Sequence, residues 1–258
     1  MGAKILIYDI ETSYLITKTW GIYESNAIGQ GKGVIEDTQI LCFAYRWYGE
    51  DETHAVAQRD FEDYVPGVNN DYSVVATLWH LFNEADIVIA HNGNRFDQKK
   101  ARARMIYHNF APHSPFKQID TKLVARKHFG FTSNKLDDLA KHFKIPGKLE
   151  TGGIETWDGC IAGDKNAWDL MIQYNKQDVV ILEQVYQRML GWMDNHPNLS
   201  VIVGRPESCP SCLAEGTMIS NGFKTTQTSR YRRFRCNACG AGCTERRAEK
   251  EQKVRYKP

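Results

Sequence analysis

The segment from Lys4 to Thr12, KILIYDIET, constrains the fold more than any other part of this 258-residue chain. Residues 5–7 are apolar without any alternation, which is typical of a strand that is buried on both faces of a sheet. Because successive side chains of a strand point to opposite faces, Asp9 and Glu11 must share one face. Two neighbouring carboxylates repel each other, and a hard divalent cation is the simplest way to make the pair favourable. An edge strand with a solvated polar face is the alternative, but the missing alternation favours a buried strand that ends at a site.

The rest of the first 200 residues alternates between apolar runs and helical periodicity. Strands are expected at residues 4–10, 38–48, 53–58, 86–90 and 116–120, and helices at 73–85, 96–109, 121–129, 135–145 and 164–193. The glycine-rich passages 21–33 and 147–163 are expected to be irregular. The helix at 96–109 is expected to carry four cations on its surface, namely Lys99, Lys100, Arg102 and Arg104. This order predicts an α/β fold, a mixed sheet flanked by helices.

Two further acidic motifs follow the first strand. HNGNRFD places Asp97 in the first turn of a helix, where capping of the helix N-terminus is an ordinary alternative role. YNKQD places Tyr174 and Asp178 four residues apart, and therefore on one face of the last long helix. Taken alone, Asp178 would be interpreted as an ordinary surface acid.

The three motifs together, in this order, resemble the DEDD superfamily of 3′–5′ exonucleases, whose fold is ribonuclease H-like. The position five residues before the last Asp is Gln173 and not His, so the chain is similar to the tyrosine branch, which includes the proofreading domains of family B DNA polymerases. The similarity continues through KLDDLA at residues 135–140 and covers residues 4–192. It is greatest to stand-alone, often phage-encoded, exonucleases of this branch.

The resemblance implies a role for each matching residue. It makes Asp9, Glu11, Asp97 and Asp178 the ligands of two Mg²⁺ or Mn²⁺ ions, and Tyr174 the residue that orients or helps to deprotonate the attacking water. Two such ions can stabilise both the attacking and the leaving oxygen of an in-line displacement. The implied reaction is phosphodiester hydrolysis from a 3′ end with release of nucleoside 5′-monophosphates.

Weaker candidates surround these motifs. The resemblance places Thr12, Asn92 and Phe96 near the terminal nucleotide, although Phe96 would serve equally well in a hydrophobic core. His91 and Asp120 could also reach the site, but Asp120 directly precedes a predicted helix, so we expect it to cap that helix.

Four of the seven cysteines form two Cys-x-x-Cys pairs that are separated by 23 residues. This spacing predicts a zinc ribbon in which one structural Zn²⁺ is bound by Cys209, Cys212, Cys236 and Cys239. Cys243, close behind the second pair, could compete as a ligand, and disulfides or a redox role are alternatives.

The region from residue 222 onward carries 11 Lys and Arg against three Glu. Such an excess of positive charge indicates a polyanionic partner, with a solubilising tail as the alternative. Basic side chains bind phosphates and aromatic side chains can stack on bases. The candidate nucleic-acid contacts in this region are Arg230, Tyr231, Arg232, Arg233, Phe234 and Arg235, although a ribbon that docks a protein would look similar.

We therefore expect a ribonuclease H-like exonuclease domain at residues 1–198 and a zinc ribbon with a basic tail at 199–258. The expected partner is nucleic acid, with 3′ ends of single-stranded DNA as substrate. Trimming of RNA ends and a binding adaptor with an idle nuclease site are the alternatives. The start of the chain does not have the pattern of a signal peptide, and we expect no membrane association and a cytoplasmic location in a bacterium or a phage-infected cell.

Overall fold

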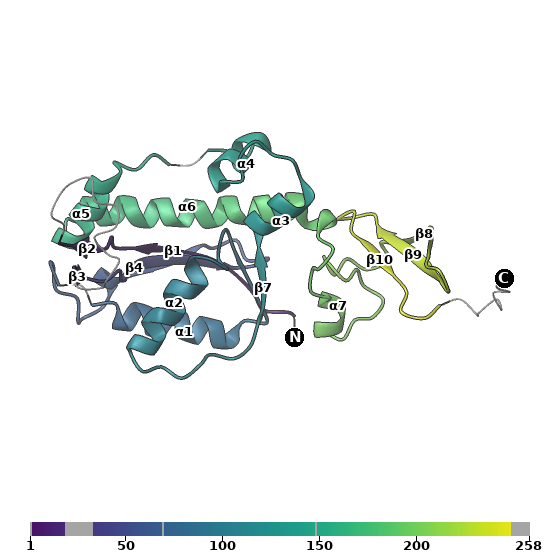
Figure 1. Cartoon of the computed structure of the whole chain (residues 1–258), viewed down its shortest axis with the longest axis horizontal. Helices are drawn as coiled ribbons and strands as arrows, with labels where there is room; N and C mark the ends of the chain where they lie inside the picture. The colour runs from purple at the N-terminus through teal and green to yellow at the C-terminus, as the bar shows by residue number, and fades with distance from the viewer. Residues whose placement is uncertain (1, 19–32, 69, 148, 249–258) are drawn as a thin grey trace. The chain divides into compact units, whose positions relative to one another are not determined.

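The computed structural model describes residues 2–18, 33–68, 70–147 and 149–248 (Figure 1). Most of the glycine-rich passage expected at 21–33 lies outside these residues. The chain divides into two units, which we call the sheet unit and the cysteine unit. The sheet unit comprises Lys4–Leu123 and Phe131–Val185, and the cysteine unit comprises Met1–Ala3, Val124–Gly130 and Tyr186–Pro258.

The sheet unit is built on a five-stranded mixed sheet with the strand order β5-β4-β1-β6-β7. Its strands are β1 (Ile5–Thr12), β4 (Ile40–Trp47), β5 (His54–Ala57), β6 (Ile87–Ala90) and β7 (Lys117–Asp120). The central strand β1 pairs antiparallel with β4 and parallel with β6. A separate small sheet pairs β2 (Ile16–Thr17) with β3 (Val34–Glu36). The expected strands are all present, and the predicted mixed α/β fold is confirmed.

Helices cover both faces of the main sheet (Figure 1). One face carries α1 (Tyr72–Glu84) and α2 (Asp97–Tyr107), and the other carries α5 (Ile154–Ala162) and α6 (Lys165–Met189). The remaining helices of the chain are α3 (Thr121–His128), α4 (Leu136–His142), α7 (Leu199–Ile202) and the 3₁₀ turns η1 (Gln58–Asp60) and η2 (Leu190–Trp192). Within the described residues, no helix combines the length and the apolar character needed to cross a membrane.

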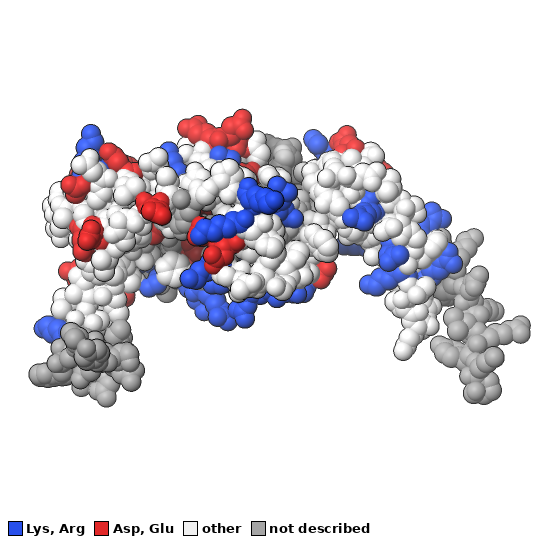
Figure 2. Space-filling model, turned by 90° about the horizontal axis from the view of Figure 1, so that it is seen from above, with Lys and Arg blue, Asp and Glu red and all other residues white. Residues whose placement is uncertain are grey.

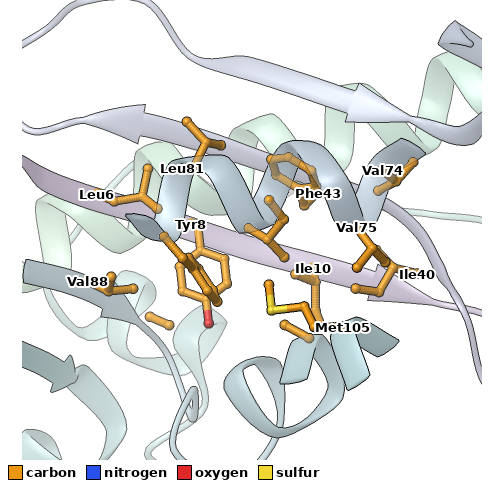
Figure 3. Close-up of a cluster of buried hydrophobic side chains, with 14 of the residues drawn as sticks. Leu6, Tyr8, Ile10, Ile40, Phe43, Val74, Val75, Leu81, Val88 and Met105 are labelled. Atoms are coloured by element: carbon orange, nitrogen blue, oxygen red, sulfur yellow. The ribbon is translucent and has the colours of Figure 1, made fainter. Parts of the chain in front are cut away.

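The presence of helices on both faces of the sheet explains the sequence of β1. Leu6, Tyr8 and Ile10 point into a core with α1 and α2 (Figure 3), and they are buried almost completely. The alternate residues Ile5 and Ile7 are buried as well. A strand that is covered on both faces needs apolar side chains at consecutive positions, so the acids at its end stand out.

Two expectations about local structure are wrong. The passage 147–163 contains α5, because two of its glycines bound the helix: Gly153 with φ of 66° precedes α5, and Gly163 with φ of 86° follows it. Gly159 lies within the helix. Arg104 is not on the surface but only 9% exposed. Its guanidinium binds both carboxylate oxygens of the fully buried Asp71 at 2.7 and 2.8 Å, and that carboxylate also accepts a hydrogen bond from the backbone N–H of Ile40.

The cysteine unit contains a three-stranded antiparallel sheet with the order β10-β9-β8. Its strands are β8 (Met218–Thr225), β9 (Arg230–Cys236) and β10 (Gly242–Thr244). The basic and aromatic residues at 230–235 lie on β9, which pairs with β8 on one edge and with β10 on the other.

Candidate active site

Three carboxylates from β1 and α6 converge on the α6 face of the sheet. One oxygen each of Asp9, Glu11 and Asp178 lies within 4.8 Å of the other two. The strand alternation predicted that Asp9 and Glu11 share a face, and the structure confirms it. Because all three donors are carboxylate oxygens, the group fits a hard divalent cation such as Mg²⁺ or Mn²⁺ better than zinc.

Asp97 is not a member of this group but is linked to it through the backbone of β1. Its Oδ1 accepts a hydrogen bond of 3.2 Å from the backbone N–H of Ile10, the residue between the first two acids. The side chain begins α2 and is only 2% exposed. Burial raises the pKa of Asp97 to about 7, against the opposing effect of the hydrogen bonds from the Ile10 and Asp97 backbone N–H groups, and the charge of Asp120 raises it further. The hydrogen bond from Ile10 holds this buried carboxylate at the end of β1 that carries Asp9 and Glu11, where a bound cation would offset the cost of its burial.

Tyr174 lies one helical turn before Asp178 on α6. Burial is the largest cause of a strongly raised pKa of its phenol, and the charges of Asp178 and Glu11 and a hydrogen bond to Asp178 add to the shift. The phenol therefore keeps its proton at neutral pH and can donate a hydrogen bond. Of the predicted catalytic residues, Asp9, Glu11, Tyr174 and Asp178 are thus brought together directly, and Asp97 adjoins them through Ile10.

Asn175 is a residue of this site that sequence reasoning missed. It is fully buried, and its Nδ2 donates a hydrogen bond of 2.8 Å to Asp9 Oδ2 and a weaker one of 3.3 Å to the Asp9 carbonyl oxygen. Its Oδ1 lies 3.9 Å from the Sγ of Cys42, which donates to it. The signal was present in the sequence, because Asn175 stands four residues from both Met171 and Val179 and so falls on the apolar face of the helix.

Comparison with known proteins agrees with this geometry. A family model of the RNase H superfamily matches residues 33–190, well over half of the chain. The chain belongs to the RNase H superfamily. The matched segment includes Asp97, Tyr174 and Asp178, whereas β1 precedes it. No curated protein sequence matches the chain.

Solved structures show the same fold. The family B DNA polymerase of the hyperthermophilic archaeon Pyrobaculum calidifontis is similar with a TM-score of 0.50 and 13% sequence identity. The match covers 74% of this RNase H superfamily chain and 25% of the polymerase. This chain therefore corresponds to about a quarter of the polymerase, and the likeness at this identity is one of fold.

The loop before α2 is held in shape by Asp120. The Oδ1 of this carboxylate accepts from the backbone N–H of Asn92 at 3.0 Å, and Oδ2 accepts from that of Asn94 at 3.2 Å. The same Oδ1 also accepts from the first turn of α3, at Lys122 N and Leu123 N, which is the expected capping role. Asn92 adopts a positive φ of 69°, a conformation that Asn tolerates better than most residues. The predicted contact residue Asn92 thus shapes the loop that leads to Asp97.

The other candidates near the site differ in exposure. Phe96 is 38% exposed, so it is available for contact with a ligand and is not part of the core. Thr12 is half-buried at the end of β1, opposite Ile40. His91 is tied to Thr121 and to the Asn134 carbonyl by contacts of 2.9 Å each, which gives it a structural role.

The four predicted cysteines of this RNase H superfamily chain form one group in the cysteine unit. A Sγ atom of each lies within 4.8 Å of the others, and the Sγ–Sγ distances are 3.7 Å for Cys209 and Cys239 and 3.8 Å for Cys212 and Cys236. Thiolates at about 2.3 Å from one tetrahedral zinc ion would be separated by about this distance. The group therefore fits Zn²⁺, and the distances are far too long for disulfides. Cys243 does not belong to the group.

Hydrogen bonds around these thiols favour the charged form of one of them. Burial acts to raise the pKa of Cys236, but the hydroxyl of Thr217 at 3.1 Å and the backbone N–H groups of Cys239 and Ala238 outweigh it and lower the pKa to about 6. Donors that stabilise a thiolate also support a sulfur ligand of a metal.

Proposed function

We propose that this chain is a metal-dependent 3′–5′ exonuclease of the tyrosine branch of the DEDD superfamily, and that its substrate is single-stranded DNA. The observation that carries the proposal is the convergence of Asp9, Glu11 and Asp178 within 4.8 Å, with Asp97 tied to the residue between the first two. A nuclease of the RNase H superfamily uses such carboxylates to bind divalent cations, and the family B polymerase to which the chain is similar supports the comparison with proofreading domains.

In the proposed mechanism Asp9, Glu11 and Asp178 would hold one ion, and Asp9 and Asp97 the other. Bound Mg²⁺ or Mn²⁺ supplies positive charge to the attacking and leaving oxygens of the scissile phosphodiester. Tyr174, which keeps its proton, orients the attacking water from its position one turn before Asp178. Asn175 fixes the side chain of Asp9 by donating to Oδ2, and the exposed ring of Phe96 would contact the terminal nucleotide.

The cysteine unit would bind one structural Zn²⁺ through its four clustered thiols. A small sheet with few large buried apolar side chains gains much of its folding free energy from such a metal. We propose that this zinc ribbon also contacts the nucleic acid, since its β9 strand carries four arginines and two aromatic residues.

A small phosphodiester tests the carboxylate site by itself. The p-nitrophenyl ester of thymidine 5′-monophosphate should be hydrolysed with Mg²⁺ or Mn²⁺ and not with EDTA. Replacing Asp178 by Asn removes a metal ligand, and a loss of about 3 kcal/mol or more of transition-state stabilisation corresponds to at least about a hundredfold lower rate.

Asp169→Asn is the matched control, because Asp169 is on the same helix but 52% exposed and paired with Arg59. This variant should keep the full rate. Equal rates for the two variants, or hydrolysis that persists in EDTA, would exclude the proposed site. Hydrolysis of DNA and RNA oligonucleotides under the same conditions decides between single-stranded DNA and RNA as the substrate.

A further inference from the structure

The candidate nucleic-acid contacts of β9 do not lie on one surface. In an antiparallel sheet, directly paired residues point to the same face, and alternate residues of one strand share a face. Arg235 pairs with Ile219 of β8 and Gly242 of β10, Arg233 with Thr244, and Tyr231 with Lys224. We call this side the open face; its members are Ile219, Lys224, Tyr231, Arg233, Arg235, Gly242 and Thr244.

The opposite face is occupied near the cysteines. There Phe234 pairs with Ser220 and Cys243, and Met218 pairs with the buried Cys236. Phe234, Met218 and Cys243 line a hollow of about 610 Å³ together with residues of the 193–211 segment, and the hollow extends along the β10 edge to Gly242, Thr244 and Glu245. Phe234 is half-buried in this hollow and does not present its ring to the surface that carries Arg233 and Arg235.

The opposite face also carries two exposed arginines, Arg230 and Arg232, but their surroundings differ from those of the open face. The guanidinium of Arg230 lies 3.5 Å from the ring centroid of Phe223. Glu245 donates its backbone N–H to the Arg232 carbonyl at 3.0 Å, so it lies opposite Arg232 and continues the pairing of β10 with β9. Because directly paired residues point to the same face, the carboxylate of Glu245 belongs to the face of Arg232. A phosphate that approached this face would meet that negative charge.

The open face has a different composition. Lys224, Arg233 and Arg235 are exposed, and none of the paired positions on this face is acidic. Tyr231 is half-exposed in the same row, and Ile219 is 47% exposed. The cysteine unit as a whole is also basic: Lys and Arg predominate over Asp and Glu on the one side of it that Figure 2 shows. Arg233 and Arg235 are two residues apart on the strand and so about 7 Å apart along it, which allows each to contact a separate phosphate.

We infer that the open face of the cysteine unit binds a single strand of nucleic acid, with Arg233, Arg235 and Lys224 on its phosphates and Tyr231 stacked on a base. Cations that alternate with an aromatic ring match the pattern of sequence-tolerant strand binding. A protein-docking surface would instead need an apolar centre without charges, and only Ile219 and Tyr231 of this face could contribute to one. The inference refines the proposed function, since it excludes Phe234, Arg230 and Arg232 as principal contacts.

Two double variants of the full chain test the choice of face. Fluorescence anisotropy measures the binding of a labelled oligothymidylate without added Mg²⁺ or Mn²⁺. Arg233→Gln with Arg235→Gln should weaken binding about tenfold at physiological salt. The fall of log K with log salt should become shallower by about 1.4 in slope, since each phosphate contact on a single strand contributes about 0.7. Arg230→Gln with Arg232→Gln removes the same charge from the opposite face and should change affinity by less than about twofold.

Further variants separate charge, stacking and folding. Arg233→Lys with Arg235→Lys keeps the charge and should restore most of the affinity. Tyr231→Leu should weaken binding by about fivefold or more, since base stacking on an aromatic ring contributes about 1–3 kcal/mol, whereas Tyr231→Phe should not. The zinc content of each variant shows whether its cysteine unit has folded.

Equal losses for the two arginine pairs, a larger loss for the opposite face, or no binding of oligothymidylate by the unaltered chain would overturn the inference. Hydrolysis of the p-nitrophenyl ester by the unaltered chain reports on the carboxylate site independently. The ester has no second nucleotide that could reach the open face, so failure of one proposal is distinguishable from failure of the other.

Discussion

Replacing Asn175 by Leu tests whether the buried amide holds Asp9 in position for metal binding. The change keeps the branching and the number of side-chain heavy atoms but removes the donor that lies 2.8 Å from Asp9 Oδ2. A hydrogen bond to a charged group contributes about 1.5–3 kcal/mol, and each 1.36 kcal/mol is a factor of ten. We therefore expect the affinity for Mn²⁺ to fall about 10- to 100-fold, in the range found for residues that orient metal ligands.

The assay is titration of the purified chain with Mn²⁺, followed by electron paramagnetic resonance of the free ion, so it does not depend on catalysis. Hydrolysis of the p-nitrophenyl ester at increasing Mg²⁺ gives a second reading, in which N175L should need more Mg²⁺ for half-maximal rate.

Gln58→Leu is the matched control. Gln58 is equally buried, and its amide donates at 2.9 Å to the Ile40 carbonyl and not to a carboxylate. This variant should lose about 1–3 kcal/mol of stability and keep its affinity for Mn²⁺. The reasoning is refuted if N175L binds Mn²⁺ as tightly as the unaltered chain, or if both variants lose affinity to the same extent.

Three further predictions concern stability and the zinc site. Burial alone would raise the pKa of Asp71, but hydrogen bonds from Arg104, His108 and the Ile40 N–H hold it below its usual 3.8. The ionised carboxylate therefore stabilises the folded state fully above pH 3.8. This contribution to stability is lost as the pH falls through the pKa of Asp71 in the folded state. Asp71→Asn should therefore lower the free energy of unfolding by about 3–5 kcal/mol at pH 7. Urea unfolding of this variant should also show a smaller loss of stability at acid pH, and an unchanged loss at acid pH would contradict this. Gly93→Ala should cost about 1–3 kcal/mol, because the new Cβ would lie 2.5 Å from the Cβ of Ala90; a urea midpoint equal to that of the unaltered chain would show that the loop can yield. Cys209→Ser should abolish the single bound zinc in elemental analysis and leave the unfolding transition of the sheet unit in place, and full zinc occupancy in this variant would speak against a four-cysteine site.

Much of the sheet unit could be predicted from local patterns. The uninterrupted apolar run of β1 required cover on both faces, and the strand alternation placed Asp9 and Glu11 together. The helix expected at 73–85 is present as α1, and its buried residues, which include Val74, Leu78, Leu81 and Phe82, have the spacing of one helical face. The spacing of the cysteine pairs likewise predicted the group that the structure forms.

The remaining features depend on partners that are distant in sequence or on exact register. Burial of Arg104 requires the carboxylate of Asp71, 33 residues earlier, and a single helix pattern does not reveal that partner. The glycines around α5 were interpreted as irregular structure, because composition alone does not distinguish a helix end from a loop. On β9 the strand alternation by itself places Arg233 and Arg235 on the face of Tyr231. Which residues of β8 share that face became clear only from the pairing, whose register shifts between Ser220 and Phe223.

The direction and mode of cleavage test the central claim most directly. A short single-stranded DNA oligonucleotide, labelled at its 5′ end in one sample and at its 3′ end in another, is incubated with the full chain and Mg²⁺, and the products are resolved at single-nucleotide length. The four carboxylates and Tyr174, acting as proposed, should produce a descending ladder from the 5′-labelled strand and immediate labelled mononucleotide from the 3′-labelled strand, and Asp9→Asn should abolish both. Internal fragments at early times, release of mononucleotide from the 5′ end, or unchanged cleavage by D9N would contradict the account.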